Sequence, residues 1–112
     1  MANVTLVVQT LGPTGITPTR NAISASNVYF LRNTGRVMLA FAKSGNGTAT
    51  ITIVTPITTG GLAVAQQTLS VPADTGDKMI GPFPPAIYNN SSGDLEFATN
   101  EGTGLTCAVV AI

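Results

Sequence analysis

The sequence predicts an all-β protein: a small antiparallel β-sandwich or jelly-roll-like barrel of about seven to eight short strands. Threonine, valine and isoleucine are abundant, and these β-branched residues favour strands. No window keeps the apolar period of a helix, and 12 glycines and 7 prolines divide the chain into short segments. A length of 112 residues suits one domain, residues 1–112, with one modest core.

The N-terminal part, residues 1–27, predicts a strand followed by a loop or an extended arm. Residues 4–11 alternate in the manner of a strand, with valines and a leucine on one face. Residues 12–19, called the arm below, pair glycines with prolines and break regular structure. The arm is either a free-standing loop or a segment that a neighbour orders, and the sequence leaves both open. Residues 21–26 are compatible with one helical turn.

The middle of the chain predicts three strands, at residues 28–31, 36–42 and 48–55. The second is apolar on both faces and is therefore expected to be central. Residues 43–47 contain an Asn-Gly pair and predict a hairpin between the second and third strands. The third strand alternates most clearly. Its inward residues are expected to be Ala49, Ile51 and Ile53, with Thr50 and Thr52 on the other face.

The C-terminal half predicts further strands separated by turns. After a loop at residues 56–61, a strand is expected from the segments 62–65 and 67–71, then a polar turn at 72–77. Residues 95–99 and 105–112 form the last two expected strands, joined as a hairpin by the glycine-rich turn 100–104. Four aromatic residues in the predicted strands are expected in the core: Tyr29, Phe30, Phe41 and Phe97.

Residues 81–88, called the proline segment below, are the least regular part of the sequence. Three prolines in four positions remove backbone donors and fix φ, so neither a helix nor a central strand is expected there. The segment nevertheless carries Phe83, Ile87 and Tyr88, so it is not expected to hang free in water. Phe83 and Tyr88 either cap one end of the sandwich or face a partner.

Composition disfavours several classes of function. The chain has five basic and five acidic residues, and the basic ones are scattered, which disfavours a nucleic-acid partner. The sequence shows no basic leader of the kind that would indicate a targeting signal. It also shows no apolar run of about 20 residues of the kind that would indicate a membrane partner. A surface with so few charges protects poorly against self-association. It therefore suits a protein that functions in contact with other proteins.

Catalysis, cofactors and metals are also not expected. Cys107 lies in an apolar strand and is interpreted as a small buried residue; a nucleophilic cysteine needs a base, and the chain has no histidine. Asp74 and Asp77 resemble half of a calcium site, but the other ligands are missing, which favours a solvated turn. The remaining acidic residues, Asp94, Glu96 and Glu101, are expected to lie exposed near the final hairpin.

Four stretches carry a resemblance to a known family: TITIVTP at 50–56, GLAV at 61–64, VPA at 71–73 and GPFPPAIYN at 81–89. They resemble small proteins encoded in the head-gene region of tailed bacteriophages, close to the major capsid protein. These proteins are similar to capsid decoration, or cement, proteins. The resemblance spans residues 34–98, is most specific at 81–89, and is loose over the first thirty residues.

The resemblance implies a virion structural protein, made in the bacterial host cytoplasm, that binds the major capsid protein on the capsid exterior. A homo-oligomer is expected, with a trimer favoured. The alternatives are a head–tail joining or tail/fibre-associated structural protein and a carbohydrate-binding adhesin module. The arm and the proline segment are the expected contacts with the capsid, because both are rigid and apolar and lack regular strand pairing. The candidate contact residues are Gly12, Pro13, Ile16 and Pro18 in the arm, and Gly81, Pro82, Phe83, Pro84, Pro85, Ile87 and Tyr88 in the proline segment.

Overall fold

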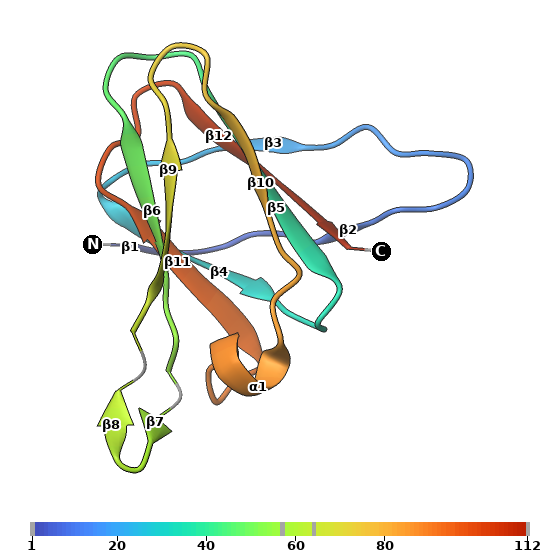
Figure 1. The fold of residues 1–112 in the computed structure, drawn as a ribbon. Helices are drawn as coiled ribbons and strands as arrows, with labels where there is room; N and C mark the ends of the chain where they lie inside the picture. The colour runs from blue at the N-terminus through green and yellow to red at the C-terminus, as the bar shows by residue number, and fades with distance from the viewer. Residues whose placement is uncertain (1, 57, 64, 112) are drawn as a thin grey trace.

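Two β-sheets face each other in the computed structural model, which describes residues 2–56, 58–63 and 65–111 (Figure 1). The all-β sandwich that the sequence predicts is confirmed. Four residues that the predicted segments include lie outside the described residues: Met1, Ile57, Val64 and Ile112.

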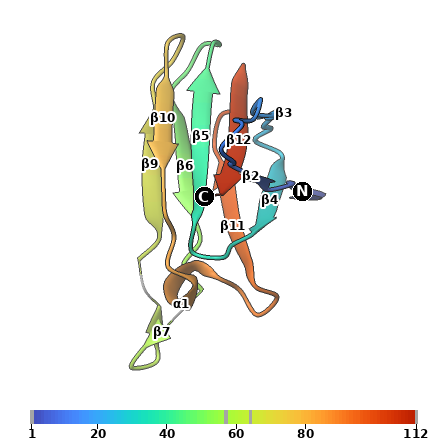
Figure 2. The ribbon, with the colours of Figure 1, turned by 90° about the vertical axis from the view of Figure 1, so that its right-hand side faces the viewer.

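Each sheet has five strands, and Figure 2 looks onto the face of the sandwich, so that the strands of one sheet lie side by side in front of the other sheet. The first sheet runs in the order β1 (Ala2–Thr5), β4 (Asn27–Arg32), β11 (Asp94–Thr99), β6 (Ala49–Ile53) and β9 (Gln67–Val71). The second sheet runs in the order β10 (Asp77–Ile80), β5 (Val37–Lys43) and β12 (Leu105–Ala111), with β2 (Gln9–Thr10) and β3 (Arg20–Ala22) sharing the far edge of β12. A small ribbon of β7 (Thr58–Thr59) and β8 (Leu62–Ala63) continues the β6–β9 pair, and the helix α1 (Pro85–Tyr88) precedes β11.

Most consecutive strands belong to different sheets. The connections from β4 to β5, β5 to β6, β9 to β10 and β11 to β12 all cross from one sheet to the other. The hairpins predicted at residues 43–47 and 100–104 are therefore wrong. Gly47 does adopt the positive φ of 83° that the Asn-Gly signal predicts. A tight turn needs that backbone geometry whichever strand follows, so the signal does not specify the pairing partner.

The strand predicted over residues 4–11 serves both sheets in turn. β1 pairs with β4, and β2 pairs with β12, both in parallel, so the sandwich is not purely antiparallel. The amide of Leu6 still donates to the carbonyl of Phe30 in the first sheet, whereas the amide of Leu11 donates to Ala111 in the second. Between them the chain crosses the sandwich, with Leu6 buried and Val7 80% exposed. Residues 21–26 hold the end of β3 and a turn in place of the helical turn considered above.

The core lies between the sheets and contains alternate residues of each central strand. The predicted inward residues Ala49, Ile51 and Ile53 are fully buried, which confirms the alternation. The ring of Phe97 stacks on Tyr29 at 5.4 Å and meets the edge of Phe41 at 5.5 Å. Complete burial of each of these aromatic side chains contributes about 1.5–3 kcal/mol to the stability of the fold. Phe30 is the exception among the predicted core aromatics, because it points to the outer face of β4 and is only partly buried.

Candidate functional site

The proline segment begins at a position that only glycine fits. Gly81 has φ of +139°, and a Cβ there would lie 2.7 Å from the carbonyl oxygen of Val37. The backbone of β10 thus passes directly against the start of β5 before it turns away from the second sheet. The peptide bond between Gly81 and Pro82 is cis.

The prediction that this segment excludes a helix is wrong, because Pro85–Tyr88 forms α1. Pro85 occupies the first helical position, where a missing N–H costs nothing and a φ near −65° is already correct. The amides of Ile87 and Tyr88 donate to the carbonyl of Pro84, and the amide of Asn89 donates to Pro85. The consecutive prolines therefore start a short helix here and do not prevent one.

Phe83 anchors the segment in the protein's own core. Its side chain is only 2% exposed, and its ring meets that of Tyr88 edge-on at 5.3 Å. Tyr88 is partly buried and packs against the core cluster. Of the two alternatives for these rings, the structure shows the cap on one end of the sandwich. Phe83 is therefore unsuitable as a direct contact residue.

Two asparagines that the sequence did not single out fix the segment to the β4–β5 connection. The amide nitrogen of Asn33 donates to the side-chain oxygen of Asn89 at 2.6 Å and to the carbonyl of Phe83 at 3.0 Å. In return, the amide nitrogen of Asn89 donates to the carbonyls of Asn33 at 3.0 Å and Gly93 at 3.3 Å. Asn33 is buried, so this reciprocal pair, the asparagine clasp, lies out of solvent. The only sequence signal was Asn89 itself, within the GPFPPAIYN stretch.

The rest of the proline segment is exposed. Pro82, Pro84, Pro85 and Ile87 face solvent, and the Ile87 side chain is 38% exposed. An open hollow of about 260 Å³ lies beside them, lined by Gly35, Arg36, Met38 and Pro82. The segment thus combines a buried anchor with an apolar surface that is held in place.

The arm is a separate element on another side of the molecule. Figure 1 shows it projecting from the β12 edge, whereas α1 lies at the lower end of the sandwich. Gly12, Pro13 and Pro18 are exposed and Ile16 is partly buried. Only the base of the arm is tied, where the Gln9 side chain donates to the carbonyl of Thr17 and accepts from the amide of Thr19. Within this chain the arm is a projecting loop, and the structure does not bring it together with the proline segment.

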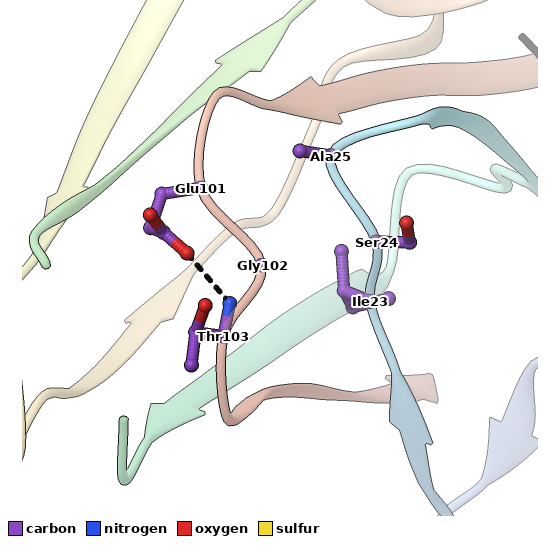
Figure 3. Close-up of a pocket in the computed structure, with 6 residues that line it drawn as sticks. All are labelled: Ile23, Ser24, Ala25, Glu101, Gly102 and Thr103. Atoms are coloured by element: carbon purple, nitrogen blue, oxygen red, sulfur yellow. Dashed lines mark hydrogen bonds between the residues drawn. The ribbon is translucent and has the colours of Figure 1, made fainter. Parts of the chain in front are cut away.

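A second open hollow, of about 360 Å³, lies at the other end of the sandwich (Figure 3). It is bounded by residues 23–25 and 101–103. The carboxylate of Glu101 accepts a hydrogen bond from the amide of Thr103 at 2.8 Å, and hydrogen bonds from Thr103 lower the pKa of Glu101. Because its one carboxylate is already used locally, the hollow does not resemble a built binding site.

The acidic residues do not converge. Asp94 starts β11 and lies 3.6 Å from Arg32, while Glu101 follows the opposite end of the same strand. Asp74, with φ of 66°, sits in the β9–β10 turn. Within residues 2–56, 58–63 and 65–111, no cluster of three or more acidic, cysteine or histidine residues could hold a metal ion. Cys107 is fully buried as predicted, and burial raises the pKa of its thiol to about 12.

Comparison of the chain with protein-family models, curated proteins and solved structures finds no match. In the described part of the chain, no helix has the length and hydrophobicity that crossing a membrane requires.

Proposed function

We propose that this protein is a virion structural protein of a tailed bacteriophage, which decorates the outer capsid surface by binding the major capsid protein. The observation that carries the proposal is the construction of the proline segment. Pro82, Pro84 and Ile87 form an exposed apolar surface whose backbone is held from inside by Phe83 and the asparagine clasp. The resemblance of GPFPPAIYN at 81–89 to the phage head-protein family supports the same function.

A surface held in this way suits binding to a preformed lattice. Association costs conformational entropy when loops and side chains must be ordered, at about 0.5–1.5 kcal/mol for each flexible side chain. Prolines have little freedom to lose, and the backbone of the segment is already fixed at both ends. Most of the contact energy from Pro82, Pro84 and Ile87 is therefore retained as affinity.

The arm supplies a second contact, displaced from the first. Because the two elements lie on different sides of the sandwich, one molecule can touch two neighbouring capsid subunits (Figure 1). A protein that binds the assembled shell and not free subunits stabilises the shell by mass action. Many linked copies, as a homo-oligomer on a lattice, add avidity to contacts that are individually modest.

Binding to assembled heads tests the proposal. Purified protein is sedimented with heads that lack it and, separately, mixed with dissociated major capsid protein; we expect it to bind the heads and not the free subunits. Ile87→Ser should weaken binding to heads about tenfold, which is the loss of one moderate contact of about 1.4 kcal/mol. Leu62→Ser is the matched control, because Leu62 is an exposed aliphatic residue on the β7–β8 ribbon, 74% exposed.

Three outcomes would contradict the proposal. Equal binding to heads and free subunits rules out stabilisation by mass action. Unchanged binding by Ile87→Ser removes the proline segment from the contact, and no binding to heads at all removes decoration.

The copy number in virions separates decoration from the connector and tail alternatives. A number that matches the capsid lattice supports decoration, whereas the few copies of a ring at one vertex support a head–tail or tail protein. The carbohydrate-binding alternative has little support, because such sites present exposed aromatic rings. Of the six aromatic residues, Tyr29, Phe41, Phe83 and Phe97 are buried and Phe30 and Tyr88 are partly buried.

A further inference from the structure

The connection between β5 and β6, residues 44–48, lies at the end of the sandwich opposite α1 and contains the only Asn-Gly pair of the sequence, Asn46–Gly47 (Figure 1). Asparagine is a thermally labile residue, because the backbone nitrogen of the next residue can attack its side-chain carbonyl carbon. A Cβ on that next residue hinders the approach, and glycine has none. Asn46 is therefore the asparagine whose reaction is least obstructed by its neighbour in the chain.

The fold leaves both reacting groups of this pair free. Asn46 and Gly47 are exposed. Among the described residues, neither the side chain of Asn46 nor the backbone amide of Gly47 makes a hydrogen bond. The residues before them are fixed, because the amide of Ser44 donates to Gly104 at 3.1 Å and the carbonyl of Gly45 accepts from the amide of Asp74 at 2.9 Å. The connection is thus held at its start and unengaged at the pair itself.

The other asparagines are engaged elsewhere in the fold. Deamidation requires a side chain that is free to turn toward the next backbone amide, and a hydrogen bond to the side chain opposes that rotation. Asn3 lies in β1 and precedes valine, whose branched Cβ hinders attack. The remaining six have their side-chain amide or oxygen in a hydrogen bond: Asn21, Asn27, Asn33, Asn89, Asn90 and Asn100.

We propose that Asn46 is a site of spontaneous deamidation. The backbone nitrogen of Gly47 bonds to Cγ of Asn46, the bond from Cγ to the side-chain nitrogen breaks, and that nitrogen leaves as ammonia with the proton that the Gly47 amide gives up. Water then opens the five-membered imide at either carbonyl carbon, which leaves aspartate or isoaspartate. Water enters and ammonia leaves, with no oxidation or reduction. The inference does not depend on the proposed binding to capsids.

Both products add a negative charge next to an existing one. The chain has a formal net charge of zero, so deamidation makes it acidic. A Cβ on Gly47 would lie 3.2 Å from a carboxylate oxygen of Glu101. Hydrogen bonds from Thr103 lower the pKa of Glu101, so its carboxylate is ionised at neutral pH. Two like charges therefore come together at this end of the sandwich, and salt should weaken their repulsion.

Isoaspartate also changes the path of the backbone. Its main chain runs through the former side chain, which lengthens the connection by a carbon atom. Gly45 packs against the backbone of Thr103 on one side of the pair, and Ala49 begins β6 on the other. The extra atom must be accommodated between these two fixed residues. Hydrogen exchange in the isoaspartate form should therefore be faster at the amides of Ser44 and Asp74, which bond across this connection.

Incubation of the whole folded protein in warm, mildly alkaline buffer, followed by digestion with trypsin, tests the inference. Cleavage after Lys43 and Lys78 releases residues 44–78, in which Asn46 is the only asparagine. This fragment should gain the mass difference between an amide and an acid and separate into two acidic species. A free peptide of residues 43–49 gives the reference rate. The folded protein should react within about tenfold of that rate, because opening a loop residue that has no hydrogen bond costs about that factor.

Two variants complete the test. Asn46→Gln is the matched control: it keeps an exposed amide but would have to form a six-membered ring, so its fragment should stay unchanged. Asn46→Asp reproduces one product and should be less stable than the unmodified protein in urea at low salt. The difference should vanish at high salt or when both proteins carry Glu101→Gln.

Three results would overturn the proposed site. A folded protein that stays unchanged while the peptide reacts would show that the fold holds the pair out of the geometry of attack. Earlier reaction of another asparagine would show that the fold does not select Asn46. Equal reaction of the Asn46→Gln fragment would place the chemistry at another residue. Equal stability of Asn46→Asp and the unmodified protein would overturn the effect of the added charge.

Discussion

Replacing Asn89 with alanine should release the proline segment while leaving the core around Phe97 intact. The substitution removes three hydrogen bonds, at 2.6, 3.0 and 3.3 Å. Each of the two shorter ones contributes about 1 kcal/mol net, and the longest less. The side-chain amide of Asn33 keeps one donor bonded to the carbonyl of Phe83, but its second N–H loses the Asn89 oxygen and is left buried without a partner, which adds a penalty of about 1–3 kcal/mol. The expected loss in the free energy of unfolding is therefore about 3–4 kcal/mol.

Urea denaturation measures this loss, and hydrogen exchange locates it. The variant should lose protection in residues 81–93 while β5, β6 and β12 keep theirs, because local opening of the segment does not expose the sandwich core. Asn46→Ala is the matched control: Asn46 lies exposed in the β5–β6 connection, and in the described structure its side chain makes no hydrogen bond. Equal costs for the two variants would refute the assignment of the clasp as the element that holds the segment.

Three further predictions follow from the same geometry. Phe83→Ala should cost about 3–5 kcal/mol in urea denaturation, as a buried aromatic does, whereas Ile87→Ala at the exposed side should change stability by about 0.5 kcal/mol or less; similar costs would contradict the assignment of anchor and surface. Gly81→Ala should destabilise by at least about 1–3 kcal/mol, because alanine must adopt the positive φ and its Cβ meets the Val37 carbonyl; a neutral effect by thermal melting would count against this backbone path. Because the pKa of Cys107 is raised to about 12, the native thiol stays protonated where the unfolded thiol ionises. Its contribution to stability is therefore constant at neutral pH and falls as pH rises from the unfolded pKa toward 12, and Cys107→Ala should lack that fall in denaturation curves measured across alkaline pH.

The strands and the core were largely predictable because alternation is a local property. The pattern Ala49, Ile51, Ile53 identifies the inward face of β6 without knowledge of any other strand. Phe30 shows the limit of that reasoning: it alternates with Tyr29 and so must face outward, and its apolar character alone suggested the core.

The pairing of strands was not predictable from the same signals. Turn residues specify a reversal of the chain, and a reversal serves equally a hairpin or a crossing to the opposite sheet. The asparagine clasp joins residues 56 positions apart in the sequence, so no local pattern indicates that Asn33 and Asn89 pair with each other. The helix α1 was missed because proline was weighed as a helix breaker without regard to its position, and Pro85 stands at the one place where it is favourable.

The position of β11 and β12 has a consequence for how the chain becomes folded during synthesis. β11 lies between β4 and β6 in the first sheet, and β12 lies between β5 and the β2–β3 edge in the second. Until residues 94–111 have left the ribosome, neither sheet has its middle, and of the strand pairs in the first sheet only β1–β4 and β6–β9 can form. Folding must therefore wait for long-range closure, which slows it.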